Sequence, residues 1–190
     1  MPTWRTASPT NRASRIACEC GAAGGSIEDS TGDAAKPIYD FNLALERVQA
    51  AVEVARSLPV PFMLTARAEN FLHGRKGMDD TIRRLQAFEA AGADVLYAPG
   101  LYSLEEMRTV TSALKKPFNA VMGFADPKIT LDQLGQAGVR RVSIGGGLNR
   151  VALKAFMDAA KQMRDGNFGF ITAMAPMAEV RSAFNPRVPQ

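Results

Sequence analysis

The chain has 190 residues, of which 46% are hydrophobic and 22% are charged, and its formal net charge is +4. This length allows one domain with a sizeable core, and the composition is ordinary for a globular protein. The basic residues are scattered and no aromatic residues alternate with them, which argues against a nucleic-acid partner. No apolar run approaches the roughly 20 residues of a membrane span, so we expect a soluble protein.

The two cysteines, Cys18 and Cys20, lie too close together in sequence to favour a disulfide. Reduced thiols are typical of a cytoplasmic protein, which is the location that we predict. A Cys/His zinc site is not expected, because His73 is the only histidine. Residues 1–16 carry arginines among Ser and Thr, a composition shared by disordered tails and mitochondrial transit peptides, and we predict a disordered tail.

The first predicted strand is "GGSIED" (24–29), and the next is "VPFMLTAR" (60–67). The segment between them has one apolar face, which predicts a helix ending near Pro59; this face carries Leu45, Val48, Val52 and Ala55. The helix after the second strand should have Asp79 as its N-cap. Its apolar face consists of Ile82, Leu85 and Phe88.

Three more strand–helix pairs follow. Their predicted strands are "ADVLYAPG" (93–100), "KPFNAVMG" (116–123) and "VRRVSIGGG" (139–147). The helices after them should pass through 104–110, 131–134 and 148–163. A short C-terminal helix is expected after Pro176, with an apolar stripe of Met177, Val180 and Phe184.

All five predicted strands are short and almost entirely apolar, which is typical of parallel strands covered by helices. Either a doubly wound sheet or a (β/α) barrel fits this alternation. No G-x-G-x-x-G opens a helix, so the dinucleotide-binding alternative is weak.

Polar side chains stand at or near the ends of these strands: Glu28 and Asp29, then Arg67, Tyr97, Asn119 and Ser143. In a barrel these ends meet at one mouth, where active sites are built. An arginine there suits a small anionic substrate, because guanidinium binds a carboxylate through two parallel hydrogen bonds. The structural alternative is an internal ion pair between Glu28 and Arg67.

The segments "GGSIEDSTGD", "TARAENFLHGR", "KPFNAVMG" and "GVRRVSIGGGLNR" resemble the isocitrate lyase/phosphoenolpyruvate mutase family. The resemblance covers roughly residues 17–184 and implies a (β/α)8 TIM barrel. It also implies magnesium-dependent cleavage of a carbon–carbon bond, for example decarboxylation, in a small 2-oxo or 2-hydroxy carboxylate such as oxaloacetate. The last helix of such barrels is often exchanged between subunits, so a homo-oligomer is expected.

The resemblance assigns Glu28 to magnesium, through water. It assigns Arg67 and Asn119 to catalysis and to the binding of a small carboxylate substrate. Tyr97, at the end of its strand, is expected to bind substrate as well.

Two departures from the family pattern restrict which branch of the family the chain resembles. The loop "STGDAAKPIYDF" (30–41) lacks the cysteine of isocitrate and methylisocitrate lyases, so we expect neither compound to be cleaved. Pro99 stands where those lyases have an acid. The remaining pattern resembles the oxaloacetate-decarboxylase-like branch.

The family's "IED" ends its fourth strand, whereas here it ends the first. We therefore predict a partial TIM barrel over 17–184, made of the fourth to eighth strands with flanking helices and an extra C-terminal helix, and a tail at 185–190. The three N-terminal βα units would carry the main magnesium-binding aspartates. Two functions stay open: a magnesium-dependent lyase, or a truncated and catalytically inactive remnant. We expect the chain on its own to leave the barrel open and to be inactive.

Overall fold

The structure is a computed structural model that describes residues 21–184. The predicted tails, Cys18 and Cys20 lie outside the described residues. The chain divides into two compact units, Met1–Gly145 and Gly146–Gln190, which we describe separately.

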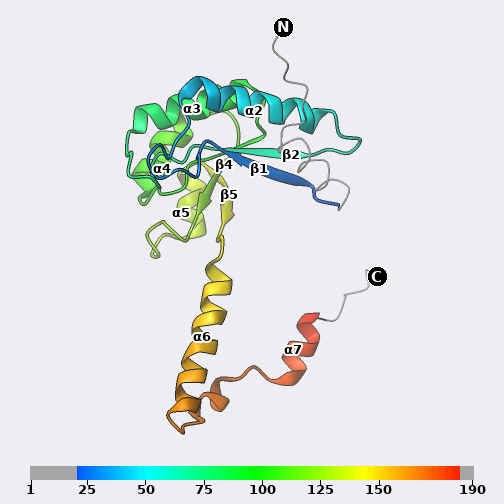
Figure 1. The fold of residues 1–190 in the computed structure, drawn as a ribbon, viewed down its shortest axis with the longest axis vertical. Helices are drawn as coiled ribbons and strands as arrows, with labels where there is room; N and C mark the ends of the chain where they lie inside the picture. The colour runs from blue at the N-terminus through cyan, green and yellow to red at the C-terminus, as the bar shows by residue number, and fades with distance from the viewer. Residues whose placement is uncertain (1–20, 185–190) are drawn as a thin grey trace. The chain divides into compact units, whose positions relative to one another are not determined.

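The first unit contains one sheet of five parallel strands, in the order β1-β2-β3-β4-β5 (Figure 1). The strands are β1 (Gly24–Glu28), β2 (Met63–Arg67), β3 (Val95–Tyr97), β4 (Phe118–Val121) and β5 (Val139–Ser143). Each predicted strand is present and all pairings are parallel. Among the described residues, β1 and β5 each pair with a single neighbour. The prediction of a five-stranded part of a barrel is therefore confirmed.

Four helices alternate with these strands: α2 (Phe41–Arg56), α3 (Met78–Ala90), α4 (Leu104–Ser112) and α5 (Leu131–Gln136). In Figure 1, α2 and α3 run along the same side of β1 and β2. The core lies between helices and strands, where apolar side chains of both are completely removed from water; the largest are Phe88, Phe118, Leu85, Leu96 and Met107. Burial of these side chains stabilises the layered arrangement.

Helix starts follow the expected capping chemistry in three cases. The Asp40 carboxylate accepts a hydrogen bond from the Leu43 N–H at the start of α2. Capping boxes begin α4 (Ser103 with Glu106) and α5 (Thr130 with Gln133). These contacts satisfy N–H groups that have no partner within their helix.

The start of α3 differs from the prediction. Its N-cap residue is Gly77, without a side-chain cap, so the assignment of Asp79 as N-cap is wrong. Asp79 and Asp80 both lie in the first turn, where negative charge interacts favourably with the positive end of the helix dipole. Asp80 uses its carboxylate for other partners, accepting hydrogen bonds from Asn70, Arg83 and Arg84.

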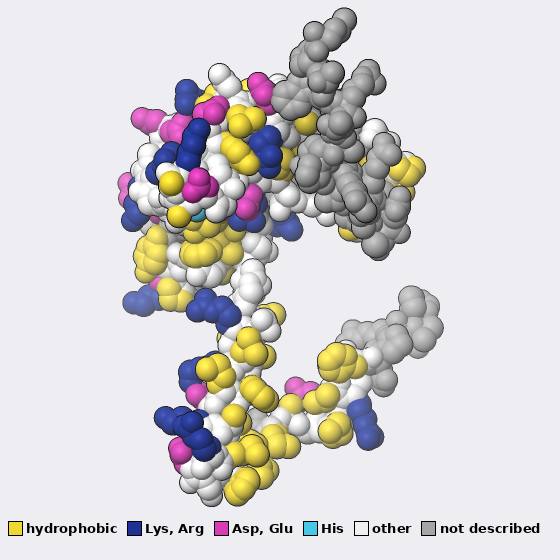
Figure 2. All heavy atoms as spheres, viewed as in Figure 1, with side chains coloured by type: hydrophobic (Ala, Val, Ile, Leu, Met, Phe, Trp, Pro, Cys, Tyr) yellow, Lys and Arg dark blue, Asp and Glu magenta, His cyan; other side chains and the backbone are white. Residues whose placement is uncertain are grey.

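The second unit consists of α6 (Gly147–Arg164), a 3-10 turn η1 (Gly169–Ala173) and α7 (Met177–Phe184), so both predicted C-terminal helices are present. The described part of the chain buries none of their residues. Figure 2 shows hydrophobic side chains gathered along this unit; the exposed ones include Leu148, Val151, Phe156, Met157 and Phe184. None of the helices in 21–184 has the length and apolar character needed to cross a bilayer.

Candidate active site

The strand register places the predicted site residues in one row across the sheet. Glu28 pairs with Arg67, and Arg67 with Tyr97. Tyr97 then pairs with Asn119. Residues in register on neighbouring strands share a face of the sheet, so four residues separated by up to 91 positions in sequence (119 − 28) become neighbours.

The same row continues to Arg141 on β5, because the pairing between β4 and β5 is irregular. Phe118 pairs with Val139, but the next residue, Asn119, pairs with Arg141. One extra residue, Arg140, is accommodated in β5 as a β-bulge. The bulge gives Arg141 the position in the row that strict alternation would have given to Arg140.

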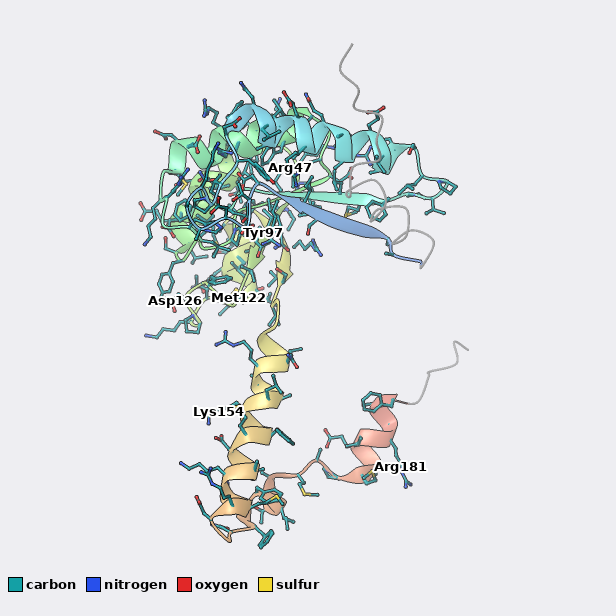
Figure 3. All side chains as sticks on the ribbon, in the orientation of Figure 1. Arg47, Tyr97, Met122, Asp126, Lys154 and Arg181 are labelled. Carbon is teal, nitrogen blue, oxygen red and sulfur yellow. The ribbon has the colours of Figure 1, made fainter. Side chains whose placement is uncertain are left out.

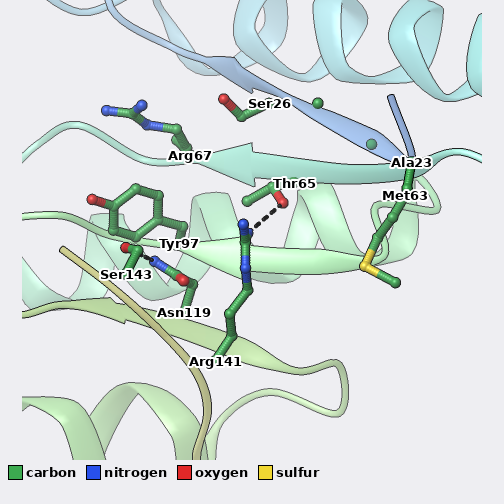
Figure 4. A pocket seen from close by; sticks show the side chains of 11 residues that line it. Ala23, Ser26, Met63, Thr65, Arg67, Tyr97, Asn119, Arg141 and Ser143 are labelled. Atoms are coloured by element: carbon green, nitrogen blue, oxygen red, sulfur yellow. Dashed lines mark hydrogen bonds between the residues drawn. The ribbon is translucent and has the colours of Figure 1, made fainter. Parts of the chain in front are cut away.

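A cavity of about 450 Å³ lies over this row (Figure 4). Three of the predicted residues, Arg67, Tyr97 and Asn119, line it. The remaining lining comes from the start of β1 and the inner face of the other strands: Ala23, Gly24, Gly25, Ser26, Met63, Thr65, Arg141 and Ser143. Tyr97 projects on the side of the sheet opposite α2, which carries Arg47 (Figure 3). Glu28 does not line the cavity, but its carboxylate forms an ion pair with Arg67, which does.

Arg67 is held by three groups. Its Nη2 lies 3.2 Å from Glu28 Oε2, and its Nε donates to Glu69 Oε1 across 2.8 Å. Its guanidinium carbon lies 4.9 Å from the centre of the Tyr97 ring, in the range of a cation–π contact. The ion pair between Glu28 and Arg67 that the sequence left open is therefore present, together with a second carboxylate that the sequence interpretation missed.

These contacts shift the ionisation of the site. Burial raises the pKa of Glu69, and the nearby Arg67 offsets this only in part. Burial alone would lower the pKa of Arg67, but the hydrogen bond and charge of Glu69 outweigh it and raise the pKa. Burial also raises the pKa of Tyr97, so its phenol is neutral at physiological pH.

Asn119 is buried, with 1% of its surface exposed. Its Nδ2 donates to Ser143 Oγ across 3.0 Å, while Oδ1 has no hydrogen-bond partner in the described structure. A buried carbonyl oxygen without a partner costs free energy, and such groups are frequent where a ligand or water completes the hydrogen bonding.

Asp29, next to Glu28, faces the other side of the strand. Its Oδ1 accepts from the Glu69 N–H across 2.8 Å, and its Oδ2 accepts from Arg84 Nη1 across 3.1 Å. Arg84 also donates to the Tyr39 carbonyl and to Asp80. Asp29 thus fixes the backbone of Glu69, which in turn holds Arg67. Burial raises the pKa of Asp29 even though Arg84 opposes the shift.

The described residues do not by themselves form a magnesium site. They contain no group of three His, Cys, Asp or Glu side chains placed to hold a metal ion. Glu28 and Glu69 both pair with Arg67, and Asp29 is engaged by Arg84. Magnesium requires six oxygen ligands in near-octahedral geometry. The half-exposed Glu28 carboxylate fits a contact through a metal-bound water, but the residues in 21–184 do not form a direct coordination shell.

A protein-family model and a curated relative each match most of the chain. The family model described as phosphoenolpyruvate phosphomutase matches residues 6–164. An oxaloacetate decarboxylase from Paraburkholderia xenovorans (strain LB400) is 33% identical over 155 residues. That alignment covers 77% of this chain and 49% of the relative, so the chain spans about half the length of this curated protein.

Two solved structures are similar as well. The crystal structure of a candidate lyase/mutase from Burkholderia cenocepacia J2315 has a TM-score of 0.87 at 52% identity, covering 93% of this chain and 64% of that one. Oxaloacetate acetylhydrolase in complex with its product oxalate has a TM-score of 0.75 at 26% identity, covering 93% of this chain and 58% of that one.

Proposed function

Because the chain belongs to the phosphoenolpyruvate phosphomutase (PEP mutase/isocitrate lyase) family, we propose that its cavity serves a magnesium-dependent, lyase-type cleavage of a small 2-oxo or 2-hydroxy carboxylate such as oxaloacetate. The bond broken would be a carbon–carbon bond, as in decarboxylation. The observation that carries the proposal is the arrangement of Arg67 beside Tyr97 and Asn119 at one cavity. The names of the oxaloacetate-processing relatives support the substrate class.

Each residue has a proposed role that follows from its chemistry. Arg67 orients a substrate carboxylate, and its two acidic partners hold the guanidinium fork in a fixed direction. Asn119 hydrogen-bonds substrate through the amide group whose Oδ1 has no protein partner. Tyr97, neutral at physiological pH, offers a hydroxyl at the same wall.

Magnesium is part of the proposal as the cofactor, with Glu28 contacting it through water. When bound, the ion would supply charge stabilisation to the enolate that forms as the carbon–carbon bond breaks. Its direct ligands would come from outside the described residues, as the resemblance predicts.

A second candidate is a catalytically inactive member of the family. It is favoured by the open edges of the described sheet at β1 and β5, and by the absence of a three-ligand metal cluster in 21–184. This form of the chain could still bind the substrate anion, so binding and catalysis need separate measurement.

The discriminating experiment measures oxaloacetate decarboxylation above the metal-catalysed background, with Mg²⁺ and with EDTA. It compares the 190-residue chain with a fusion that adds the three N-terminal βα units expected from the resemblance. We expect Mg²⁺-dependent activity in the fusion, its loss in Arg67→Ala, and none in the chain alone. The matched control is Arg83→Ala, a change at an exposed arginine of α3.

Activity of the short chain that disappears with Arg67→Ala would show that the three added units are not needed. A folded fusion without activity would favour the inactive alternative. Glyoxylate release from isocitrate would contradict the expected absence of that activity, which rests on the missing cysteine in 30–41.

We also propose that the second unit mediates homo-oligomer formation and that the protein acts in the cytoplasm. The apolar side chains of α6 and α7 are exposed, and burying them against a second copy would remove them from water. Analytical ultracentrifugation of the wild type against Val151→Glu tests the association, and a monomeric wild type would contradict it.

A further inference from the structure

We propose that Arg141 is a second anion-binding side chain of the cavity, and that together with Arg67 it makes the cavity selective for small dianions over monoanions. The proposal rests on the proposed function, since it concerns the same cavity, and it adds the charge class of the substrate and a residue that determines it.

The β-bulge in β5 is the first observation. Val139 packs into the core between sheet and helices, so alternation from Val139 would turn Arg140 toward the cavity and Arg141 into the core. The extra residue reverses this: Arg141 pairs with Asn119, and Val142, paired with Ala120, packs against the core. Arg140 instead donates to the carbonyl groups of Gly135 and Val139. Bulges next to sites commonly redirect one side chain in this way.

The charge balance of the two cavity arginines is the second observation. Two carboxylates, Glu28 and Glu69, already lie against Arg67. Arg141 forms no salt bridge with a described residue, and its one hydrogen bond there is a long one, 3.4 Å from Nη1 to Thr65 Oγ1. Within 21–184, acidic side chains therefore compensate the guanidinium of Arg67 but not that of Arg141.

The positions of the two guanidinium groups suit two separate carboxylates. Arg141 extends from β5 across the cavity until its Nη1 reaches Thr65 of β2 (Figure 4). Thr65 lies two residues before Arg67 on the same strand face, a spacing of about 7 Å along a strand. Arg67 and Arg141 thus line one cavity from different strands, so a dicarboxylate offers one carboxylate to each of them, whereas a monocarboxylate can engage only one.

Asn119 adds a polar group between these positions. Its amide lines the cavity and its register partner is Arg141. The unpartnered Oδ1 accepts from a hydroxyl or water, so a dianion that carries a hydroxyl, or binds with a water, satisfies it.

The test uses two pairs of probes that differ by one charge at nearly constant shape: oxalate against oxamate, and succinate against succinamate. Affinities are measured by calorimetry on the wild-type chain, Arg141→Met and the matched control Arg140→Met. Both variants remove one positive charge from neighbouring positions, so a general electrostatic effect changes both equally. Arg141→Lys keeps the charge and removes the planar fork.

We expect the wild type to bind each dianion more tightly than its amide partner. Arg141→Met should weaken dianion binding about tenfold or more, as expected for the loss of a charge-assisted contact, and weaken monoanion binding less, because a monoanion can bind at Arg67 instead. Arg140→Met should resemble the wild type. In the wild-type chain, the Nε–Hε signal of Arg141 should shift on addition of oxalate in an NMR titration. The titration itself uses only the wild-type chain, and a variant serves only to assign the signal.

Equal dianion affinities in Arg141→Met and Arg140→Met, or an Arg141 signal that does not respond to oxalate, would overturn the inference. So would a wild-type chain that binds neither dianion. The proposed function can fail while this inference holds. In that case dianion selectivity depends on Arg141, but the extended protein does not decarboxylate oxaloacetate.

Discussion

The guanidinium of Arg84 on α3 donates to the carboxylate of Asp29 at the end of β1, across 3.1 Å, and both side chains are almost completely buried. The second oxygen of Asp29 accepts from the backbone of Glu69, so the pair connects the helix layer to the residue that holds Arg67. A buried pair of this kind contributes to stability mainly through the cost of losing one partner, because the other charge is then left uncompensated.

Arg84→Met should lower the free energy of unfolding by about 3–5 kcal/mol, the range for breaking a buried ion pair. Urea unfolding followed by circular dichroism measures the change. Arg83→Met is the matched control one residue away, where the side chain is 62% exposed, and it should cost about 0.5 kcal/mol or less. A loss below about 1 kcal/mol in Arg84→Met would show that the pair is not a main support of the site.

Asn119→Leu should separate stability from ligand binding. The substitution puts an apolar group of similar size in place of an amide whose buried oxygen has no partner and whose nitrogen donates to Ser143 Oγ. The Ser143 hydroxyl keeps the Ala120 carbonyl as a partner. We expect the free energy of unfolding to stay within about 1 kcal/mol of the wild type or to rise. Oxalate affinity should fall, because the cavity loses its amide. Calorimetry and urea unfolding on the same preparation provide both values, and a variant that keeps full affinity would remove Asn119 from the binding site.

We predict that Asp94 contributes to the free energy of unfolding at neutral pH and that this contribution is lost in acid. Its carboxylate accepts from Arg56 across 2.6 Å and from the Leu64 N–H across 2.8 Å. Burial alone raises the pKa of Asp94, but these hydrogen bonds outweigh it, so the folded-state pKa lies below the ordinary 3.8. The unfolded chain therefore binds a proton more readily. The contribution is complete above the unfolded pKa and is lost as the pH falls through the lower folded value.

Asp94→Asn should accordingly cost about 1 kcal/mol at pH 7, a modest value because Arg56 is half exposed. The difference from the wild type should shrink below pH 3.8 and vanish below the folded pKa. Thermal unfolding between neutral and strongly acidic pH checks this. A difference that persists unchanged at the acid end would assign the effect to packing rather than to charge.

Gly138, between α5 and β5, should not tolerate a side chain. Its φ is +87°, and a Cβ built there would lie 2.6 Å from Thr111 Oγ1, which donates to the Ala137 carbonyl. We expect Gly138→Ala to lower the free energy of unfolding by about 1–3 kcal/mol or more. Gly135→Ala is the control, since no described atom outside the backbone of α5 and the neighbouring residues lies within 4 Å of its Cβ position, and it should stabilise by about 0.5–1 kcal/mol. Equal effects of the two substitutions would contradict the steric argument.

The sequence predicted the strands well because each is a short run between helical segments and is mostly apolar, a pattern that depends only on local composition. It also placed Arg67, Tyr97 and Asn119 near strand ends, since parallel strands bring those ends together. The predicted N-cap of α3 was wrong because Asp79 and Asp80 are both residues that often cap helices. The hydrogen bond that Asp80 accepts from Asn70 is a tertiary contact that the local sequence does not indicate.

Two parts of the site could not be read from the chain. Asp29 and Arg84 are 55 residues apart, and no periodic pattern marks them as partners. Arg141 was missed because period-two alternation cannot indicate a bulge. The available signal for Glu69 was its position two residues after Arg67, within reach of the same guanidinium.

The bulge at Arg140 also bears on how such a cavity can change during evolution. Val139, before the bulge, faces the core, and so does Val142, three residues later; strict alternation from Val139 would turn Val142 to the cavity. A deletion of one residue at this point would restore regular alternation without moving Val139 out of the core. Arg141 would stay opposite Asn119, and Ser143 opposite Val121, so β5 can lose the bulge residue and keep its cavity-facing side chains.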